Sequence, residues 1–291
     1  METDKERKTM EAKKRTGLVL EGGAMRGLFT AGVLDVWMEA GVAMDVVAGV
    51  SAGAAFGCNF LSGQAGRVLR YNARFCPDWR YRSLRSLLKT GDLYGADFCY
   101  RELPDVLDPF DRAAFNRSPM AFYAVCTDLE TGQAVYQPCP RADGEAFAYM
   151  RASASMPLVS RPVQIGGRLL MDGGIADSIP FAWMQKQGVD RIVAVLTRPR
   201  AYEKKRQRGA ALLLRRYPAA REMLKTRAER YNESRRQVFA AEKAGGCFVI
   251  CPQDDLPVGH VEHSEERLRR AYALGAEQAR ETLSALRAYL A

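Results

Sequence analysis

A Gly-x-Ser-x-Gly motif at residues 49–53 presents Ser51 as a candidate nucleophile. An apolar run over residues 46–50 leads into the motif, and small residues that suit the start of a helix follow it. This order is typical of a nucleophile elbow, the tight turn from strand into helix that exposes a serine side chain. Neighbouring backbone crowds Gly49 and Gly53 in such a turn, so glycine fits best there. The same five residues also fit a glycine-rich turn whose serine has no function.

A serine hydroxyl is a weak nucleophile and needs a neighbouring base. One candidate base is Asp172, which ends a predicted strand and precedes two glycines, although Asp-Gly-Gly is also common in ordinary turns. The chain has two histidines, His260 and His263, and both follow Ser51 and Asp172 in the order of an α/β-hydrolase triad. They lie in a polar connector between the last predicted strand and helix. A Ser–Asp dyad and a Ser–Asp–His esterase triad therefore both stay open.

A glycine-rich loop at residues 22–27, Gly-Gly-Ala-Met-Arg-Gly, follows the first predicted strand and opens a helix. Its consecutive backbone N–H groups are the kind of preorganised donors that stabilise an oxyanion. The rival interpretation is a dinucleotide-binding Gly-x-Gly-x-x-Gly fingerprint. Ala24 occupies the middle glycine position of that fingerprint, and the second strand ends in the elbow instead of a ribose-binding acid. The loop therefore favours an oxyanion site.

The elements that must position these residues alternate between strand and helix. We predict strands over 17–21, 45–50, 120–126, 133–137, 163–165, 168–171, 191–196 and 247–250. Helices are predicted from about 28 to 40, after Ser51, over 145–156, after Pro180, and over 264–290 with Ser264 as N-cap; residues 63–118 read as short helical pieces. This pattern predicts an α/β fold of three layers, in which helices flank a mostly parallel central sheet.

Composition restricts the classes of protein that are compatible with the chain. Its 291 residues are 47% hydrophobic and 26% charged, typical of a globular protein, and no apolar run approaches the length of a membrane span. Residues 1–16 are polar, lack the apolar core of a signal peptide, and are predicted to be a disordered tail. Seven scattered cysteines suit reduced thiols in a cytoplasmic protein, and no metal or other cofactor is predicted.

The formal net charge of +9 is concentrated in one segment. Residues 201–236 hold twelve Lys and Arg against four Asp and Glu, a surplus of eight. We predict a helix there, interrupted near Pro218. Such a run is often the solvated face of a helix, but it also fits peripheral contact with an anionic membrane surface. No nucleic-acid motif accompanies it, so nucleic acid is not expected as a partner.

Three stretches together resemble the patatin-like phospholipase family, especially its bacterial branch with a C-terminal extension. They are Glu21–Gly27, Gly49–Gly53 and Asp172–Gly174, in this order and spacing. Residues 151–157 also resemble the segment before Asp-Gly-Gly in that family. The resemblance is strong over about 16–196 and looser beyond.

The resemblance implies a Ser–Asp dyad that works without histidine. Ser51 would attack an ester carbonyl, Asp172 would accept the proton, and the amides of Gly22, Gly23 and Ala24 would hold the oxyanion. Ala24 is a departure, because the family usually has glycine there. The supporting motif positions would be Arg26, Gly27, Gly49, Gly53, Gly173 and Gly174, with Arg26 either ordering its loop or meeting a lipid phosphate.

The expected function is hydrolysis of acyl esters in lipids, of the phospholipase A or lysophospholipase kind, through an acyl-Ser51 intermediate. We expect a catalytic domain over residues 17–200 and a helical extension over 201–291 that packs on the same domain. The alternative from another class is a catalytically silent binding or regulatory protein that keeps the same core.

Overall fold

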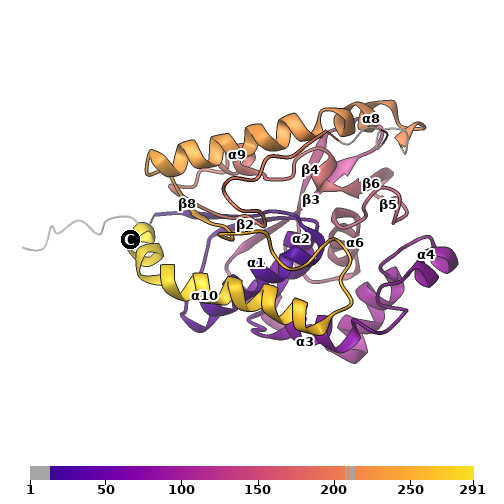
Figure 1. Ribbon diagram of the computed structural model, residues 1–291, viewed down its shortest axis with the longest axis horizontal. Helices are drawn as coiled ribbons and strands as arrows, with labels where there is room; N and C mark the ends of the chain where they lie inside the picture. The colour runs from indigo at the N-terminus through magenta and orange to yellow at the C-terminus, as the bar shows by residue number, and fades with distance from the viewer. Residues whose placement is uncertain (1–13, 207–208, 210–213) are drawn as a thin grey trace, which may run out of the picture.

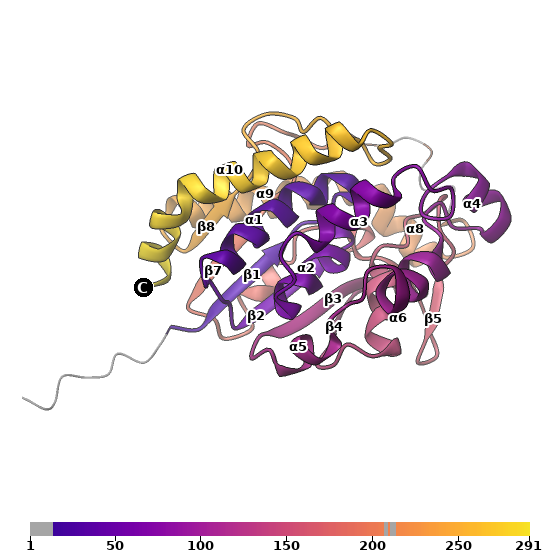
Figure 2. The same cartoon turned by 90° about the horizontal axis from the view of Figure 1, so that it is seen from below.

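A computed structural model describes residues 14–206, 209 and 214–291. The described chain folds into three layers, with helices on both faces of a central sheet (Figures 1 and 2). The sheet has eight strands in the order β5-β6-β3-β2-β1-β7-β8, and β4 pairs with β3 outside this path. Strands β3, β2, β1, β7 and β8 run parallel to one another. The predicted mostly parallel α/β architecture is therefore confirmed.

The strands lie close to the predicted positions. Their bounds are β1 Thr16–Leu20, β2 Val46–Val50, β3 Ala121–Asp128, β4 Ala134–Pro138, β5 Val163–Ile165, β6 Arg168–Asp172, β7 Arg191–Val195 and β8 Cys247–Ile250. Every residue of β1 and β2 is buried, as expected for central strands covered on both faces. The first strand begins at Thr16, and residues 1–13 of the predicted tail lie outside the described residues.

One face of the sheet is covered by α1 (Gly27–Glu39), α2 (Ala52–Ser62), α6 (Gly144–Ser153) and the C-terminal α10 (Glu265–Leu290). Ser264 caps α10 as predicted, because its Oγ accepts a hydrogen bond from the Arg267 N–H. Helix α10 lies along α1 (Figure 2), and two glycines allow the close approach. A Cβ on Gly32 would lie 2.1 Å from the Tyr272 carbonyl oxygen, and one on Gly275 would lie 2.0 Å from that of Phe29.

The opposite face is covered by the short α7 (Phe181–Met184) and by α9 (Arg227–Lys243), with α8 (Pro218–Lys225) leading into α9 (Figure 1). The predicted helix from residue 201 is wrong for residues 201–206, which form a turn and irregular backbone. Pro218 begins α8 at its first turn instead of interrupting a helix. Residues 207–208 and 210–213 of this segment lie outside the described residues.

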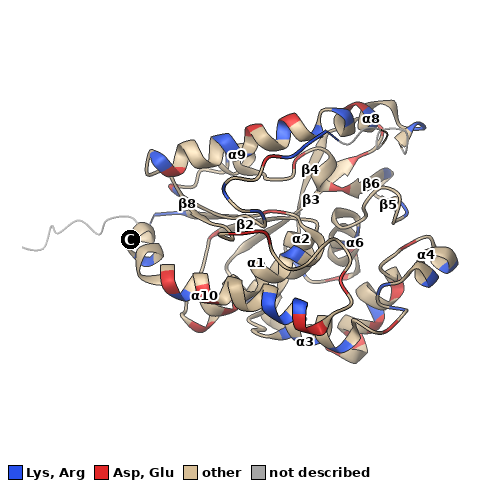
Figure 3. Cartoon of the chain, viewed as in Figure 1, with Lys and Arg blue, Asp and Glu red and all other residues tan. Residues whose placement is uncertain are grey.

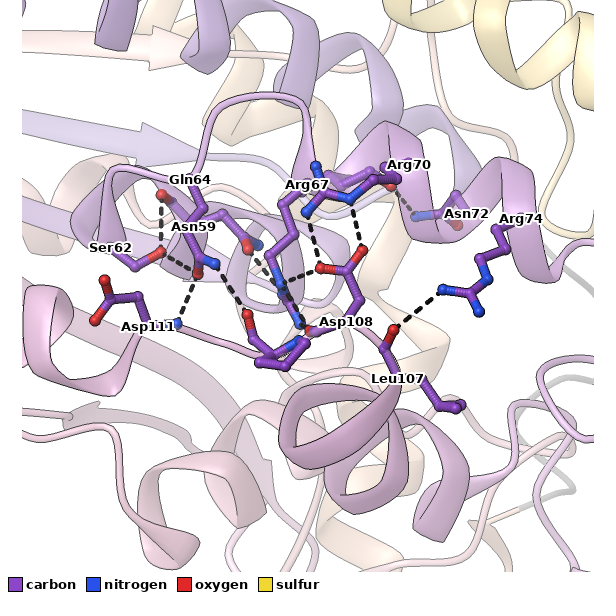
Figure 4. Close-up of polar contacts among 12 residues, drawn as sticks. Asn59, Ser62, Gln64, Arg67, Arg70, Asn72, Arg74, Leu107, Asp108 and Asp111 are labelled. Atoms are coloured by element: carbon purple, nitrogen blue, oxygen red, sulfur yellow. Dashed lines mark hydrogen bonds and ion pairs between the residues drawn. The ribbon is translucent and has the colours of Figure 1, made fainter.

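Residues 67–117 form the predicted short helices: α3 (Arg67–Phe75), α4 (Leu84–Thr90), a π-helical segment (Phe98–Leu107) and α5 (Arg112–Arg117). Asp108, which follows the π-helical segment, binds two arginines of α3, as Figure 4 shows. Its carboxylate accepts two hydrogen bonds from Arg70, both 2.8 Å, and forms an ion pair with the buried Arg67. Arg67 also donates to the Asn59 side chain on α2 at 2.9 Å. The charge of Arg67 is thereby neutralised inside the fold.

Candidate active site

Ser51 lies in the turn between β2 and α2 with φ 54° and ψ −119°, in the left-handed half of backbone space. Its Oγ donates a 2.7 Å hydrogen bond to Oδ2 of Asp172. Both residues are buried, with 7% and 5% of their surface exposed. A non-glycine residue with such a φ is strained, and strain of this kind concentrates at functional sites. The turn therefore has the geometry of a nucleophile elbow.

The pairing of β2 and β6 with the same edge of β3 brings these two residues together. Residues 121–125 of β3 pair with β2, with Val125 opposite Val50. Residues 126–128 of β3 pair with the antiparallel β6, with Cys126 opposite Asp172. Because β4 occupies the other edge of β3, β2 and β6 lie in line along the same edge. The two strands therefore meet end to end, and Ser51 and Asp172 are the residues at the junction.

Asp172 is held by several hydrogen bonds besides the one from Ser51. Its Oδ1 accepts from the Gly174 N–H at 2.7 Å, and its carbonyl oxygen accepts from the Thr127 hydroxyl at 2.8 Å. Burial raises the pKa of the Asp172 carboxyl above its ordinary value. The positive charge of Arg227 and the hydrogen bond from Ser51 oppose that rise. A carboxylate with a raised pKa, in contact with a hydroxyl, is suited to accept its proton.

Ser153 supports the elbow in a way that the sequence did not reveal. Its fully buried Oγ accepts a 2.9 Å hydrogen bond from the Ser51 N–H. The same hydroxyl donates to the Val125 carbonyl oxygen at 2.5 Å. Ser153 thus joins the end of α6 to the strained turn and to β3. The only available signal was the resemblance of residues 151–157 to a family segment.

The loop of residues 22–24 lies beside Ser51. The backbone N–H groups of Gly22, Gly23 and Ala24 donate to no acceptor among the described residues. A Cβ on Gly22 would lie 3.0 Å from the Cβ of Ser51, which shows how close the loop comes. Ala24 has φ 49°, so an L-residue occupies a conformation that favours glycine. Backbone N–H groups without a described acceptor, in a loop next to a serine hydroxyl, are candidate donors to an oxyanion.

The supporting motif positions pack at close quarters around this centre. A Cβ on Gly49 would lie 2.4 Å from the Gly53 carbonyl oxygen, and one on Gly53 would lie 2.4 Å from that of Leu20. Gly173 and Gly27 are equally confined, by the Val125 carbonyl oxygen and the Ala52 Cβ respectively. The elbow therefore requires glycine for space, as the sequence predicted for positions 49 and 53.

The two histidines do not share one environment. His260 lines the cavity that contains Ser51, but its ring makes no hydrogen bond to a described residue. Partial desolvation and four nearby cations lower the pKa of His260 to about 4. The His263 ring instead faces the Cys76 carbonyl oxygen, with Nδ1 3.4 Å away. The position that a triad histidine would occupy against Ser51 is taken by Asp172.

A search of protein-family models identifies "Patatin-like phospholipase" over residues 18–182. The chain belongs to the patatin-like phospholipase family. A second model, a domain of unknown function (DUF6363), matches residues 217–291 of this patatin-like protein.

Two curated relatives each match a little under two thirds of the chain. "Lysophospholipase NTE1" of Coccidioides immitis is 27% identical over 62% of this chain and 11% of its own length. "Uncharacterized protein YjjU" of Escherichia coli is 29% identical over 64% of this chain and 52% of its own. Among solved structures, VipD from Legionella pneumophila has a TM-score of 0.49 and 13% identity, over 94% of this chain and 67% of that one. The chain therefore spans from about a tenth to about half of the length of these two curated relatives.

Two cavities meet beside Ser51 in this patatin-like fold, and Ala24 and Met156 contribute to both walls. The first, which we call the apolar cavity, is lined mainly by aromatic and aliphatic side chains, among them Phe56, Tyr71 and Phe147. The second, which we call the cationic cavity, contains Ser51 and Asp172. Its wall also includes Glu21 and four basic side chains: Arg26, Arg198, Lys204 and Arg227.

In the described part of the chain, no group of three or more His, Cys, Asp or Glu side chains is arranged to hold a metal ion. Among the described helices, none combines the length and apolar character needed to cross a bilayer.

Proposed function

We propose that the protein is a serine acyl-ester hydrolase of lipids, of the phospholipase A or lysophospholipase kind. The observation that carries the proposal is the 2.7 Å hydrogen bond from Ser51 Oγ to Asp172 Oδ2, next to a loop whose three N–H groups have no acceptor among the described residues. Membership of the patatin-like phospholipase family supports the same reaction class. The name "Lysophospholipase NTE1" of a relative supports a lysophospholipid substrate.

In the acylation step, Ser51 Oγ attacks the carbonyl carbon of the ester and transfers its proton to the Asp172 carboxylate. The N–H groups of Gly22, Gly23 and Ala24 stabilise the negative charge on the carbonyl oxygen. Collapse of the tetrahedral intermediate breaks the bond between the carbonyl carbon and the alcohol oxygen. Asp172 then returns its proton to the leaving alcohol.

In the deacylation step, a water molecule takes the place of the departed alcohol. Asp172 accepts a proton from the water as its oxygen attacks the acyl-Ser51 carbonyl, and the same amides hold the second oxyanion. Release of Ser51 Oγ with the proton from Asp172 completes the turnover and frees a fatty acid. The apolar cavity offers the acyl chain a place away from water, which supports a lipid over a small polar ester.

Peripheral contact of a cytoplasmic enzyme with an anionic membrane through residues 201–236 stays a prediction. Several basic residues of this segment are exposed: Lys205, Arg206, Arg215, Arg216, Lys225 and Arg236. Three of them pair with glutamates on α8 or α9, and Figure 3 shows both signs of charge along α9. Charge reversal at Arg215 and Arg216 should weaken co-sedimentation with anionic vesicles at low salt. Unchanged sedimentation would count against this contact.

We also propose that residues 201–291 pack on the domain formed by residues 17–200 as one folding unit. The contact of α10 with α1 supports this, because Tyr272 donates a 2.7 Å hydrogen bond to the buried Asp35 on α1. Truncation after residue 200 should therefore leave insoluble or molten protein, as judged by near-ultraviolet circular dichroism.

The decisive experiment measures fatty-acid release from lysophospholipid micelles by wild-type protein and by Ser51→Ala. We expect the substitution to lower the rate at least about 10⁴-fold without loss of folding. Labelling by a fluorophosphonate probe should disappear in parallel. A well-folded wild-type protein that neither labels nor releases fatty acid would instead support the catalytically silent alternative.

The triad alternative is tested by His260→Ala and His263→Ala. Under the proposed dyad, both variants keep fluorophosphonate labelling and hydrolysis of a soluble short-chain ester within a few-fold of wild type. A loss of several orders of magnitude in either variant would assign the base to histidine.

A further inference from the structure

Four basic side chains from separate segments converge on the cationic cavity beside Ser51. Arg26 comes from the glycine-rich loop, Arg198 follows β7, Lys204 lies six residues further along, and Arg227 begins α9. All four act electrostatically on the same ring, that of His260. They therefore share one small region, although they span two hundred residues of sequence.

Two of these cations make no ion pair in the described part of the chain. Arg26 is buried, and its Nε has no hydrogen-bond partner there. The Lys204 ammonium lies 4.5 Å from the centroid of the Tyr231 ring, which is its one described contact. The other two have polar partners: Arg198 pairs with the exposed Asp255 at 2.8 Å, and Arg227 donates to the Gly174 carbonyl oxygen.

The acidic groups of the cavity do not balance these charges. Among the described residues, two carboxylates line it, those of Glu21 and Asp172. Glu21 already accepts a hydrogen bond from the Tyr231 hydroxyl and one from the Thr197 N–H, both 2.6 Å. Asp172 accepts from Ser51. Even when Asp255, the partner of Arg198, is counted with these two carboxylates, the four cations leave an excess of positive charge among the described side chains.

An uncompensated cluster of cations in a partly desolvated cavity is costly unless an anion binds there. Burial, together with repulsion from Arg227, lowers the pKa of Lys204 to about 8. Guanidinium and ammonium groups together are suited to a phosphate, which accepts several charge-assisted hydrogen bonds. The apolar cavity, which shares Ala24 and Met156 with the cationic cavity, suits the acyl chain of a lipid. The cationic cavity is therefore available for the polar headgroup.

We propose that the cationic cavity binds a phosphate group and that Lys204 and Arg227 contribute to it from outside the region matched by the patatin-like family model. For the lipid half, the proposal rests on the proposed function. It names the preferred substrates as phospholipids or lysophospholipids of net negative charge, over zwitterionic ones. A free phosphate compound is the other source of the same chemistry.

The lipid arm of the test compares kcat/KM for lysophosphatidylglycerol and lysophosphatidylcholine with the same acyl chain. We expect wild type to prefer the anionic lipid and Lys204→Met to lower that preference about ten-fold, equal to about 1.4 kcal/mol. Lys204→Arg keeps the charge and should restore the preference. The matched control is Lys205→Met, because the exposed Lys205 does not line the cavity and its removal changes net charge equally. Lys204 is the better probe than Arg227, which also holds Gly174 beside Asp172.

The second arm needs no turnover. Binding of sn-glycerol 3-phosphate to wild type, Lys204→Met and Lys205→Met is followed by broadening of the ³¹P NMR signal. The proposal expects binding by wild type that weakens about ten-fold in Lys204→Met alone. If no lipid is hydrolysed but this pattern holds, the proposed function fails and the phosphate site stands, with a free phosphate as its ligand. The phosphate site is overturned if Lys204→Met matches Lys205→Met in both arms, or if wild type binds no glycerol phosphate and shows no charge preference.

Discussion

Arginine side chains line both the apolar and the cationic cavity. Their charges are paired with carboxylates in the apolar cavity, whereas two basic side chains of the cationic cavity have no ion pair with a described residue. In the apolar cavity, Arg67 is neutralised by Asp108 (Figure 4) and Arg151 lies 3.4 Å from Asp92. In the cationic cavity, Arg26 and Lys204 have no ion pair with a described residue. The cationic cavity thus differs from the apolar one in two respects: four basic side chains line it against two, and two of the four have no ion pair with a described residue. The same residue types give an acyl-compatible surface on one side of Ser51 and an anion-compatible one on the other.

The two cavities also draw on different parts of the chain. The apolar cavity is built by residues 24–160, inside the region matched by the patatin-like family model. Three of the four cations in the other cavity, Arg198, Lys204 and Arg227, lie beyond that region. We infer that recognition of the acyl chain belongs to the shared family core, whereas preference for a headgroup is set by the C-terminal part. The predictions below test this division.

The largest effect is expected where the two cavities meet. Asp172→Asn keeps the size of the side chain but cannot accept the Ser51 proton, so kcat should fall about 10³- to 10⁴-fold. The loss should affect anionic and zwitterionic lysophospholipids alike, because both need the same base. Steady-state hydrolysis of the two lipids measures it, with thermal unfolding as the control for folding. A fall of less than ten-fold would place the base elsewhere.

The next effect should be confined to the apolar cavity. Ala55 on α2 is half-buried in its wall, and Ala55→Phe would fill the space with a ring. We expect the ratio of kcat/KM for a long-chain over a butyryl ester to fall about 100-fold, as three to four methylenes stay in water at about 0.8 kcal/mol each. Ala113→Phe adds the same ring to an exposed position on α5 and should leave the ratio unchanged. An equal loss for both ester lengths would show that the cavity does not hold the chain.

A smaller effect should appear in the pH dependence of the cationic cavity. Burial and the positive charges of Arg227, Arg26 and Arg198 lower the pKa of Lys204 to about 8, and the negative charge of Glu21 opposes them. Because a lysine loses its charge above its pKa, the preference for anionic over zwitterionic lysophospholipid should decline several-fold between pH 7 and 9. Lys204→Arg should stay charged and keep the preference across this range. A wild-type preference that does not change with pH would exclude Lys204 as its source.

The fall of kcat/KM at low pH, the acidic limb of the pH–rate profile, depends on Asp172. Its pKa is raised by burial and lowered by Arg227, so loss of the Arg227 charge should raise it further. Since the reaction needs the ionised carboxylate, the acidic limb of kcat/KM should move to higher pH in Arg227→Gln. The limb is measured with a neutral short-chain ester, so that headgroup binding does not contribute. If the acidic limb does not move in Arg227→Gln, the charge of Arg227 does not influence the pKa of Asp172.

The sequence predicted the sheet, the elbow and the strand that ends at Asp172, because these depend on local apolar patterns and glycine spacing. It could not predict that β6 would run antiparallel into the end of β2, since that requires the pairing of β3 with both. The sequence also predicted a basic helix over residues 201–236, interrupted near Pro218. In the structure, Arg230 and Arg235 donate to backbone carbonyl groups and Lys204 turns into the site, a result of tertiary packing that charge counting does not reveal.

The smallest expected effect concerns Ala24, which contributes to both cavity walls. Its φ of 49° suits glycine, so Ala24→Gly should raise the free energy of unfolding by about 1 kcal/mol, despite the greater freedom of glycine in the unfolded chain. The midpoint of urea denaturation measures the change. Ala240→Gly, at an exposed position inside α9, should instead lower stability by about 0.5 to 1 kcal/mol. If Ala24→Gly gains stability but turns over more slowly, the Ala24 side chain keeps the apolar and cationic cavities apart. A loss of stability in Ala24→Gly would contradict the strain assigned to this loop.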